Sequence, residues 1–141
     1  MKVIHVVDAD TLLVKDGNNI MRVQLIGVDA PEKTGPGRYP QCFDDESKHL
    51  AVEQFLSKNL DVRLIRDDLL TDTDPSGRSL RYVYLKNGDL LNQKILQEGL
   101  GKQYLDPAHK YQKQDQFSKN QEEARSKNLG IWDPQGCHGQ F

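Results

Sequence analysis

The amino-acid sequence predicts an α+β fold in which five strands form a small β-barrel and three helices pack beside it. Residues 20–27 place different side chains on alternate positions, with the period of a strand. Carboxylates at residues 44–46 precede apolar residues at helical spacing. Four further β-rich segments flank these stretches. Because 141 residues suffice for one core and not comfortably for two, we expect residues 1–141 to form a single domain.

The first three predicted strands follow one another closely. Residues 2–7 are β-rich, and residues 11–14 continue after a corner at residues 8–10. Residues 16–19 read Asp-Gly-Asn-Asn, which is a strong signal for a hairpin turn. Residues 20–27 then form the third strand.

The middle of the chain contains the first predicted helix and two more strands. Residues 33–43 are rich in glycine, proline and polar side chains, which indicates a loop. A helix begins at residues 44–46, because the helix dipole favours carboxylates at that end. Residues 60–65 and 80–85 are the fourth and fifth strands, the latter after a turn at Asp74-Pro75-Ser76-Gly77.

Two helices complete the predicted fold. The first spans residues 91–98 and ends before Gly99, and the second spans residues 108–128. One helix between the third and fourth strands and two after the fifth fit the OB-fold, a partly open five-stranded barrel. Periodicity by itself does not separate this fold from other α+β arrangements.

The composition is that of an ordinary globular protein with a slight excess of acid. The formal net charge is −2, from 19 Lys and Arg against 21 Asp and Glu. This balance argues against a protein that coats nucleic acid through a basic surface, but a metal ion can carry positive charge locally. No apolar run is long enough to cross a membrane. If the protein is exported, we expect its export signal to lie outside these residues.

Three short segments contain the residue types of a catalytic site. They are Asp8-Ala9-Asp10-Thr11, Gly27-Val28-Asp29-Ala30-Pro31-Glu32 and Asp74-Pro75-Ser76-Gly77-Arg78. Each alone is more often a plain turn or strand exit. Two cysteines, Cys42 and Cys137, lack the spacing of a zinc site and are open to two interpretations, buried free thiols or a long-range disulfide.

The order of these segments resembles that of the staphylococcal nuclease (thermonuclease) family. Family members have Asp-x-Asp-Thr after the first strand, Gly-Ile/Val-Asp-x-Pro-Glu after the third and Asp-x-x-Gly-Arg before the fifth. They also have an Asn at the start of the second helix, here Asn92, and a terminal Gly-x-Trp, here Gly130-Ile131-Trp132. The resemblance covers nearly the whole chain.

The resemblance implies a calcium site. Asp10 and Asp29 would be direct ligands, together with the backbone carbonyl of Ala30, where the family often has Thr. Asp8 would lie outside them and orient the ligands or bound water. Carboxylate and carbonyl oxygens are the ligands that Ca²⁺ prefers.

The resemblance also implies the catalytic groups. Glu32 would act as the general base, and Arg78 would bind a phosphate oxygen and stabilise the added negative charge. The family has a second catalytic arginine where this chain has Gln24. Arg22 lies two residues earlier on the same face of the strand and is the candidate substitute. The metal site is therefore expected to be complete and the turnover to be weakened.

Around this centre, the substrate-binding residues are less closely matched. Tyr104 is the nearest candidate to flank a base, with packing as an equal alternative, and Lys102 is a candidate phosphate contact that is more often simply solvated. Some exported relatives have cysteines in places similar to Cys42 and Cys137, which implies a disulfide and an oxidising compartment.

The predicted function is therefore that of a calcium-dependent endonuclease that hydrolyses DNA and RNA and leaves 3′-phosphate ends. The expected partners are DNA and RNA, preferably single-stranded, with no membrane. The expected state is a monomer that is secreted or held in the cell envelope. The alternative is an OB-fold module that binds single-stranded nucleic acid and has lost most of its catalysis through Gln24.

Overall fold

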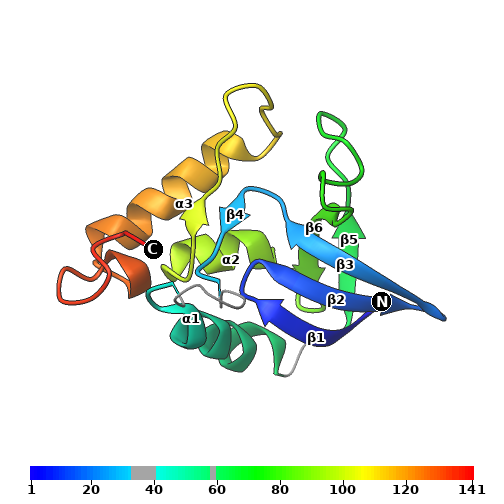
Figure 1. Cartoon of the computed structure of the whole chain (residues 1–141), viewed down its shortest axis with the longest axis horizontal. Coiled ribbons are helices and arrows are strands. Elements are labelled where there is room, and N and C mark those ends of the chain that lie inside the picture. Colours follow the sequence, from blue (N-terminus) through cyan, green and yellow to red (C-terminus); the bar gives the residue numbers. More distant parts are fainter. Residues whose placement is uncertain (33–40, 58–59) are drawn as a thin grey trace.

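A five-stranded sheet forms the centre of the fold in the computed structural model, which describes residues 1–32, 41–57 and 60–141. Its strands are β1 (Lys2–Asp8), β2 (Thr11–Asp16), β3 (Asn19–Leu25), β5 (Val62–Ile65) and β6 (Ser79–Leu85). The strands lie in the order β1-β2-β3-β6-β5 (Figure 1). Neighbours are antiparallel, except for the parallel pair β3 and β6.

The two edges of this sheet approach each other without joining in a ladder. Within the described residues, β1 meets the segment before β5 through an isolated bridge between Lys2 and Asp61. Two backbone hydrogen bonds of 2.8 Å accompany it, from the Val3 amide to Leu60 and from the Val62 amide to Met1. The predicted α+β class with five strands and three helices is confirmed, but the sheet is not closed into a barrel, since β1 and the segment before β5 share only this isolated bridge within the described residues.

Two strands of two residues each form a second, smaller sheet that the sequence did not indicate. β4 (Val28–Asp29) pairs antiparallel with β7 (Lys102–Gln103), so that Asp29 lies opposite Lys102. Gly27 makes the turn into β4 with a φ of +76°, and a Cβ at this position would lie 2.7 Å from both Tyr111 and Phe117. A larger residue at 27 would therefore displace β4 and the acidic residue that it carries.

The helices lie beside the sheet. α1 (Asp44–Ala51) continues into a π-helical turn, η1 (Val52–Leu56), and lies below β1 in Figure 1. α2 (Leu91–Gln97) lies between the sheet and α3 (Gln114–Ser126), and a short 3₁₀ helix, η2 (Gly130–Trp132), follows α3.

Asn92 at the start of α2 ties the helix to the sheet, which explains its place in the motif. Its Oδ1 accepts a hydrogen bond of 2.9 Å from the Val83 amide, and its Nδ2 donates to the carbonyls of Ile26 and Arg81. The side chain is fully buried. It therefore satisfies backbone groups at the junction of β3, β6 and α2, directly behind the turn that leads to Asp29.

The last helix begins six residues later than predicted, and the prediction of a helix from residue 108 is wrong. The amides that would form its first turn have other partners. The Gln112 amide donates to Oδ2 of the buried Asp67 at 2.7 Å, and the Lys113 amide donates to the Tyr82 hydroxyl at 3.3 Å. These bonds come from residues far away in the sequence, so helical propensity could not reveal them.

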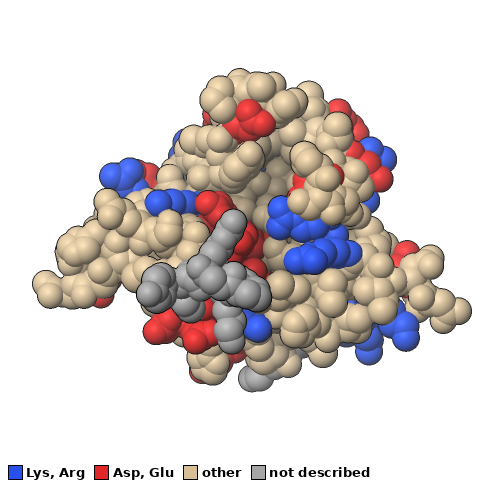
Figure 2. Space-filling view, viewed as in Figure 1, with Lys and Arg blue, Asp and Glu red and all other residues tan. Residues whose placement is uncertain are grey.

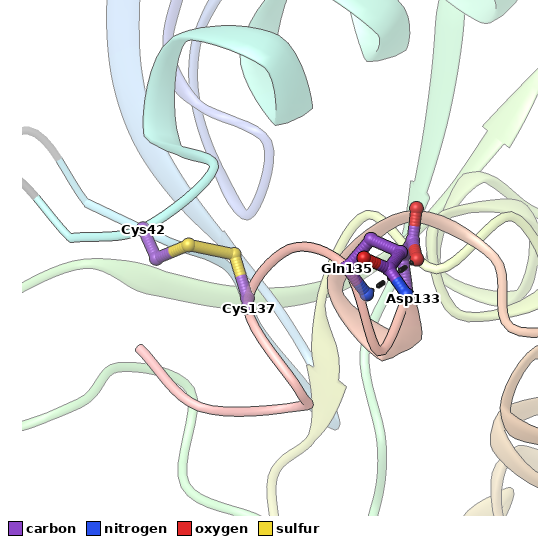
Figure 3. The surroundings of a disulfide bond; sticks show 4 residues. All are labelled: Cys42, Asp133, Gln135 and Cys137. Carbon is purple, nitrogen blue, oxygen red and sulfur yellow. Dashed lines mark hydrogen bonds between the residues drawn. A yellow bond between two sulfur atoms is a disulfide. The ribbon is translucent and has the colours of Figure 1, made fainter.

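The predicted disulfide between Cys42 and Cys137 is confirmed. Figure 3 shows it linking the segment that leads into α1 with the C-terminal tail. Just before Cys137, the tail forms a turn in which the Gln135 amide donates a hydrogen bond of 2.8 Å to Asp133 Oδ1. The bond therefore fixes two segments that are 95 residues apart in the sequence.

Removing this disulfide is expected to lower the free energy of unfolding by about 4–5 kcal/mol, because the cross-link removes chain entropy from an unfolded loop of this length. The measurement is urea unfolding of the Cys42→Ser/Cys137→Ser protein against the oxidised parent. Thiol counting on unfolded, unreduced parent protein is expected to find no reactive thiol. Two reactive thiols, or equal unfolding midpoints, would contradict the assigned role of the bond.

Candidate functional site

Most of the residues predicted from the motifs meet at one cavity of about 790 Å³, which is lined by Asp10, Gln24, Asp29, Glu32 and Arg78. Its lining comes from Asp10 at the corner between β1 and β2, the β3–β4 region with Glu32, residues 70–80, and residues 104–111. In Figure 2, acidic atoms lie on one wall of a central hollow and lysine and arginine atoms lie on the facing wall. The cavity thus combines acidic groups with a cationic group, as binding of a metal ion and an anion together requires.

A group of three carboxylates occupies the acidic side. Asp8 and Asp10 lie at the corner between β1 and β2, and Glu32 follows β4, with ligand oxygens that all lie within 4.8 Å of one another. Asp10 is 2% exposed. Its Oδ2 accepts a hydrogen bond of 3.0 Å from the Ala30 amide, and its Oδ1 accepts one of 3.0 Å from the Thr11 hydroxyl. Asp10 is therefore fixed by two neighbours, one of which is Ala30.

The raised pKa values of Asp10 and Asp29 indicate that these carboxylates have too few positive charges nearby to favour their ionised form. The pKa of Asp10 is raised to about 6, mainly by burial and also by the charges of Glu32 and Asp8, while the hydrogen bonds from Ala30 and Thr11 oppose the rise. Burial and the charge of Glu32 also raise the pKa of Asp29, while Lys102 lowers it. A cation bound among them would reverse these shifts, because it favours the ionised form.

Asp29 lies in the same cavity but outside the close group of three. It is on β4 and its side chain is more exposed than that of Asp10. The structure therefore brings Asp8 and Glu32 nearest to Asp10. The assignment of Asp10 and Asp29 as the two carboxylate ligands stays a prediction.

Glu32 is exposed, and its backbone is bonded to Gln41. The Glu32 amide donates to Gln41 Oε1 at 2.7 Å, and the Gln41 amide donates to the Glu32 carbonyl at 3.1 Å. These two residues flank residues 33–40, which lie outside the described part of the chain together with most of the loop predicted there.

Arg78 lies on the opposite side of the cavity and is held by the turn that precedes it. Asp74 accepts hydrogen bonds from the Arg78 amide at 2.9 Å and from its Nε at 2.7 Å. Arg78 Nη1 donates to Gln24 Oε1 at 2.7 Å. A guanidinium has five N–H groups, so donors remain on Nη1 and Nη2 to form a charge-assisted pair with a phosphate.

Gln24 accepts hydrogen bonds in this structure, a role opposite to the donor role of an arginine. Its Oε1 accepts a hydrogen bond from Arg78 Nη1, and its Nε2 donates to the Val28 carbonyl at 3.2 Å. The Thr11 hydroxyl lies 3.0 Å from both Gln24 Oε1 and Asp10 Oδ1 and has one proton to share between these two acceptors. Thr11 also contacts Asp10, so a continuous network joins the acidic group to the arginine. Gln24 thereby orients Arg78.

The remaining predicted residues lie at different distances from this centre. Tyr104 lines the cavity and is 54% exposed. Lys102 lies opposite Asp29 in the small sheet, with its Nζ 4.8 Å from the centre of the Phe141 ring, and is not among the residues that line the cavity. Arg22 is exposed on β3 and is likewise not among the lining residues.

Three residues of the site were not assigned a role from the sequence. Thr11 and Asp74 lie within the motifs, and spacing could have suggested Asp74, since it precedes Arg78 by four residues across a tight turn. No local signal pointed to Gln41, because its partner lies nine residues away across a polar loop.

Comparison with known proteins agrees with the geometry. Residues 22–134 match the family model described as Staphylococcal nuclease homologue. The chain is 35% identical over 134 residues to the thermonuclease of Staphylococcus intermedius, which covers 92% of this chain and 73% of that protein. It is 32% identical over 129 residues to the thermonuclease of Staphylococcus hyicus, at 91% and 73% coverage. It is also 32% identical over 132 residues to the SPbeta prophage-derived endonuclease YokF of Bacillus subtilis, at 92% and 43% coverage.

Proposed function

Because the chain belongs to the staphylococcal nuclease homologue family and is a nuclease, we propose that it is a calcium-dependent endonuclease of DNA and RNA that leaves 3′-phosphate ends. One observation carries this proposal: an acidic group around a buried Asp10 shares a cavity with the guanidinium of Arg78. A phosphodiester fits between these opposite charges.

The residues on the acidic side suit calcium. Asp10 is a buried carboxylate whose raised pKa has burial as its main cause, and it is surrounded by further carboxylate oxygens. Ca²⁺ takes six to eight such oxygen ligands in flexible geometry. We assign Asp10, Asp29 and the Ala30 carbonyl to the ion, with Asp8 as the residue that orients them. When bound, Ca²⁺ supplies positive charge that polarises the phosphate and makes a nearby water more acidic.

Two residues carry the proton and charge steps. Glu32 accepts a proton from the water whose oxygen attacks phosphorus, and the bond from phosphorus to the 5′ oxygen breaks. The 3′ side keeps the phosphate, and the 5′ oxygen takes up a proton. Arg78 donates hydrogen bonds to the nonbridging oxygens as their negative charge grows, with Asp74 and Gln24 holding its guanidinium in place.

Substrate binding is assigned to the rim of the cavity. The exposed ring of Tyr104 suits stacking on an unpaired base, which supports a preference for single strands. Lys102 lies opposite Asp29 in the small sheet and is assigned a weaker contact with the phosphate backbone.

A second candidate function is a binding module with little catalysis. It is favoured by Gln24, which accepts a hydrogen bond at the place where the resemblance puts a second catalytic cation. This candidate predicts binding of single strands with no cleavage.

We assign the protein to an oxidising compartment, as a secreted or cell-envelope enzyme. The disulfide between Cys42 and Cys137 supports this assignment, because such bonds persist mainly outside the reducing cytosol. Among the described residues, no helix has the length and apolar character needed to cross a membrane.

The function is tested by incubating purified protein with denatured DNA, and separately with RNA, in the presence of calcium or a chelator. We expect fragments whose 3′ ends lose phosphate to a phosphatase, and no fragments with the chelator. The matched control is Arg78→Lys, which keeps the charge but loses the fork geometry and is expected to cleave more slowly. Cleavage that continues in the chelator would contradict calcium dependence, and binding without cleavage would favour the second candidate.

A further inference from the structure

Glu32 is attached to the rest of the protein in an unusual way for a general base. It is exposed and lies three residues after β4, beyond the ladder that fixes Asp29. Both backbone hydrogen bonds described for it run to Gln41, one through the Gln41 side chain and one through its amide. Gln41 therefore holds the backbone that carries the Glu32 carboxylate beside Asp10.

Gln41 is in turn held from two sides. Its carbonyl accepts a hydrogen bond of 3.2 Å from the Asp44 amide at the start of α1, and its neighbour Cys42 is bonded to Cys137. α1 is itself docked, because the buried Ser47 hydroxyl donates to the carbonyl of Leu100. A side-chain acceptor restrains Glu32 only if its own segment is held, and these contacts hold the segment that carries Gln41.

The other end of the disulfide lies in the C-terminal tail, which packs on η2 and reaches Lys102. The Gly139 amide donates to the Ile131 carbonyl, and a Cβ at Gly139 would collide with the Trp132 ring, so the tail packs closely on η2. The tail ends with the ring of Phe141 against Lys102, the residue paired with Asp29. The bond thus ties the segment that holds Glu32 to the strand that neighbours Asp29.

From these contacts we propose that Gln41 is a positioning residue for Glu32, and that the Cys42–Cys137 bond keeps Gln41 in place so that reduction of the bond slows turnover. This inference rests on the proposed role of Glu32 as the base. The hydrogen bonds are exposed and each contributes little to stability. Their effect falls on geometry, since a misplacement of about 1 Å in a reacting group can slow catalysis by about a hundredfold.

The test compares three substitutions at residue 41 and at the disulfide. Gln41→Met keeps the size but removes the acceptor, and we expect kcat to fall about tenfold to a hundredfold with KM and calcium-linked stabilisation unchanged. Gln41→Glu keeps an acceptor oxygen at the same length and is expected to restore most of kcat. The kcat of Cys42→Ser/Cys137→Ser and of the reduced wild type is also expected to fall, as in Gln41→Met.

Two further measurements separate positioning from general loss of structure. When Gln41→Met is combined with the double serine variant, the loss of activation free energy derived from kcat is expected to be smaller than the sum of the two separate losses, because both changes act on one contact. Hydrogen exchange of the Glu32 amide is expected to be protected in the oxidised parent and Gln41→Glu, and fast in Gln41→Met. All rates are measured well below the melting temperature of each variant.

The outcomes distinguish this inference from the proposed function. If Glu32→Gln is inactive and Gln41→Met has the parental kcat, the inference is wrong and the proposed function stands. A raised KM with unchanged kcat in Gln41→Met would also overturn it, in favour of substrate contact. If Glu32→Gln cleaves like the parent, Glu32 is not the base and both proposals fall.

Discussion

Replacing Asp10 with asparagine is expected to abolish calcium-linked stabilisation and cleavage while making the metal-free protein more stable at neutral pH. The first effect follows from loss of the buried carboxylate at the centre of the acidic group. In the parent, a ligand present at a hundred times its dissociation constant adds about 2.7 kcal/mol to the free energy of unfolding. The variant is expected to gain none of this.

The second effect follows from the raised pKa of Asp10. Its pKa rises from 3.8 to about 6 on folding, mainly through burial. Between these values the folded state holds a proton that the unfolded state has released, so stability falls as pH rises through this window and stays low above it. Asparagine has no charge to bury, and the variant is expected to be about 2–3 kcal/mol more stable than the parent at pH 7 in a chelator.

Asparagine at position 10 can keep the contacts with Ala30 and Thr11, with the direction of the Thr11 hydrogen bond reversed. The new carboxamide can accept from the Ala30 amide and donate to the Thr11 hydroxyl, which still donates to Gln24. The measurement is thermal unfolding from pH 4 to pH 8, with and without calcium, beside a cleavage assay. Asp16→Asn, on the exposed hairpin and not among the residues that line the cavity, is the matched control for the change of charge. Calcium that stabilises Asp10→Asn as it does the parent would show that the ion binds elsewhere.

Local sequence patterns were sufficient for most of the sheet. The alternation in residues 20–27 and the Asp-Gly-Asn-Asn turn before it correspond to β3 and the hairpin that leads to it. The strands β4 and β7 could not be predicted, since two residues show no period, yet they place Asp29 opposite Lys102. The start of α3 could not be predicted either, because the Gln112 amide donates a hydrogen bond to Asp67, which is 45 residues away in the sequence.

The motifs identified the residues of the site better than their roles. Asp10, Glu32 and Arg78 do meet at one cavity, as the order of the segments implied. The role of Gln24 could not be read from its position, because its hydrogen bond to Arg78 comes from a residue 54 positions away in the sequence. Sequence spacing gives the chemical type of a group, whereas the direction of its hydrogen bonds depends on tertiary contacts.

The hydrogen bond between Arg78 and Gln24 determines what effect an arginine at position 24 is expected to have. Gln24 holds Arg78 through Oε1, so its replacement removes one of the two acceptors that fix the Arg78 guanidinium. The other acceptor, Asp74, remains, with its carboxylate 2.7 Å from Arg78 Nε. Arg78 is therefore expected to keep its place, while a second guanidinium enters a cavity that also contains Asp10, Asp29 and Glu32 to balance its charge.

Gln24→Arg is accordingly expected to raise the cleavage rate about tenfold to a thousandfold, the scale of a single donor aimed at developing negative charge. The measurement is kcat on denatured DNA at saturating calcium. Gln24→Lys supplies charge without the planar fork and is expected to gain less. Gln24→Met removes the acceptor and adds no charge, so it is expected to fall below the parent.

Arg22→Ala in both backgrounds then tests whether Arg22 substitutes for the missing arginine. It is expected to slow the parent more than Gln24→Arg, because only the parent can depend on a substitute from the exposed side of β3. If Gln24→Arg and Gln24→Met fall equally while calcium binding is preserved, the acceptor role of Gln24 is the one that catalysis needs. The site would then work with the single guanidinium of Arg78, held between Asp74 and Gln24.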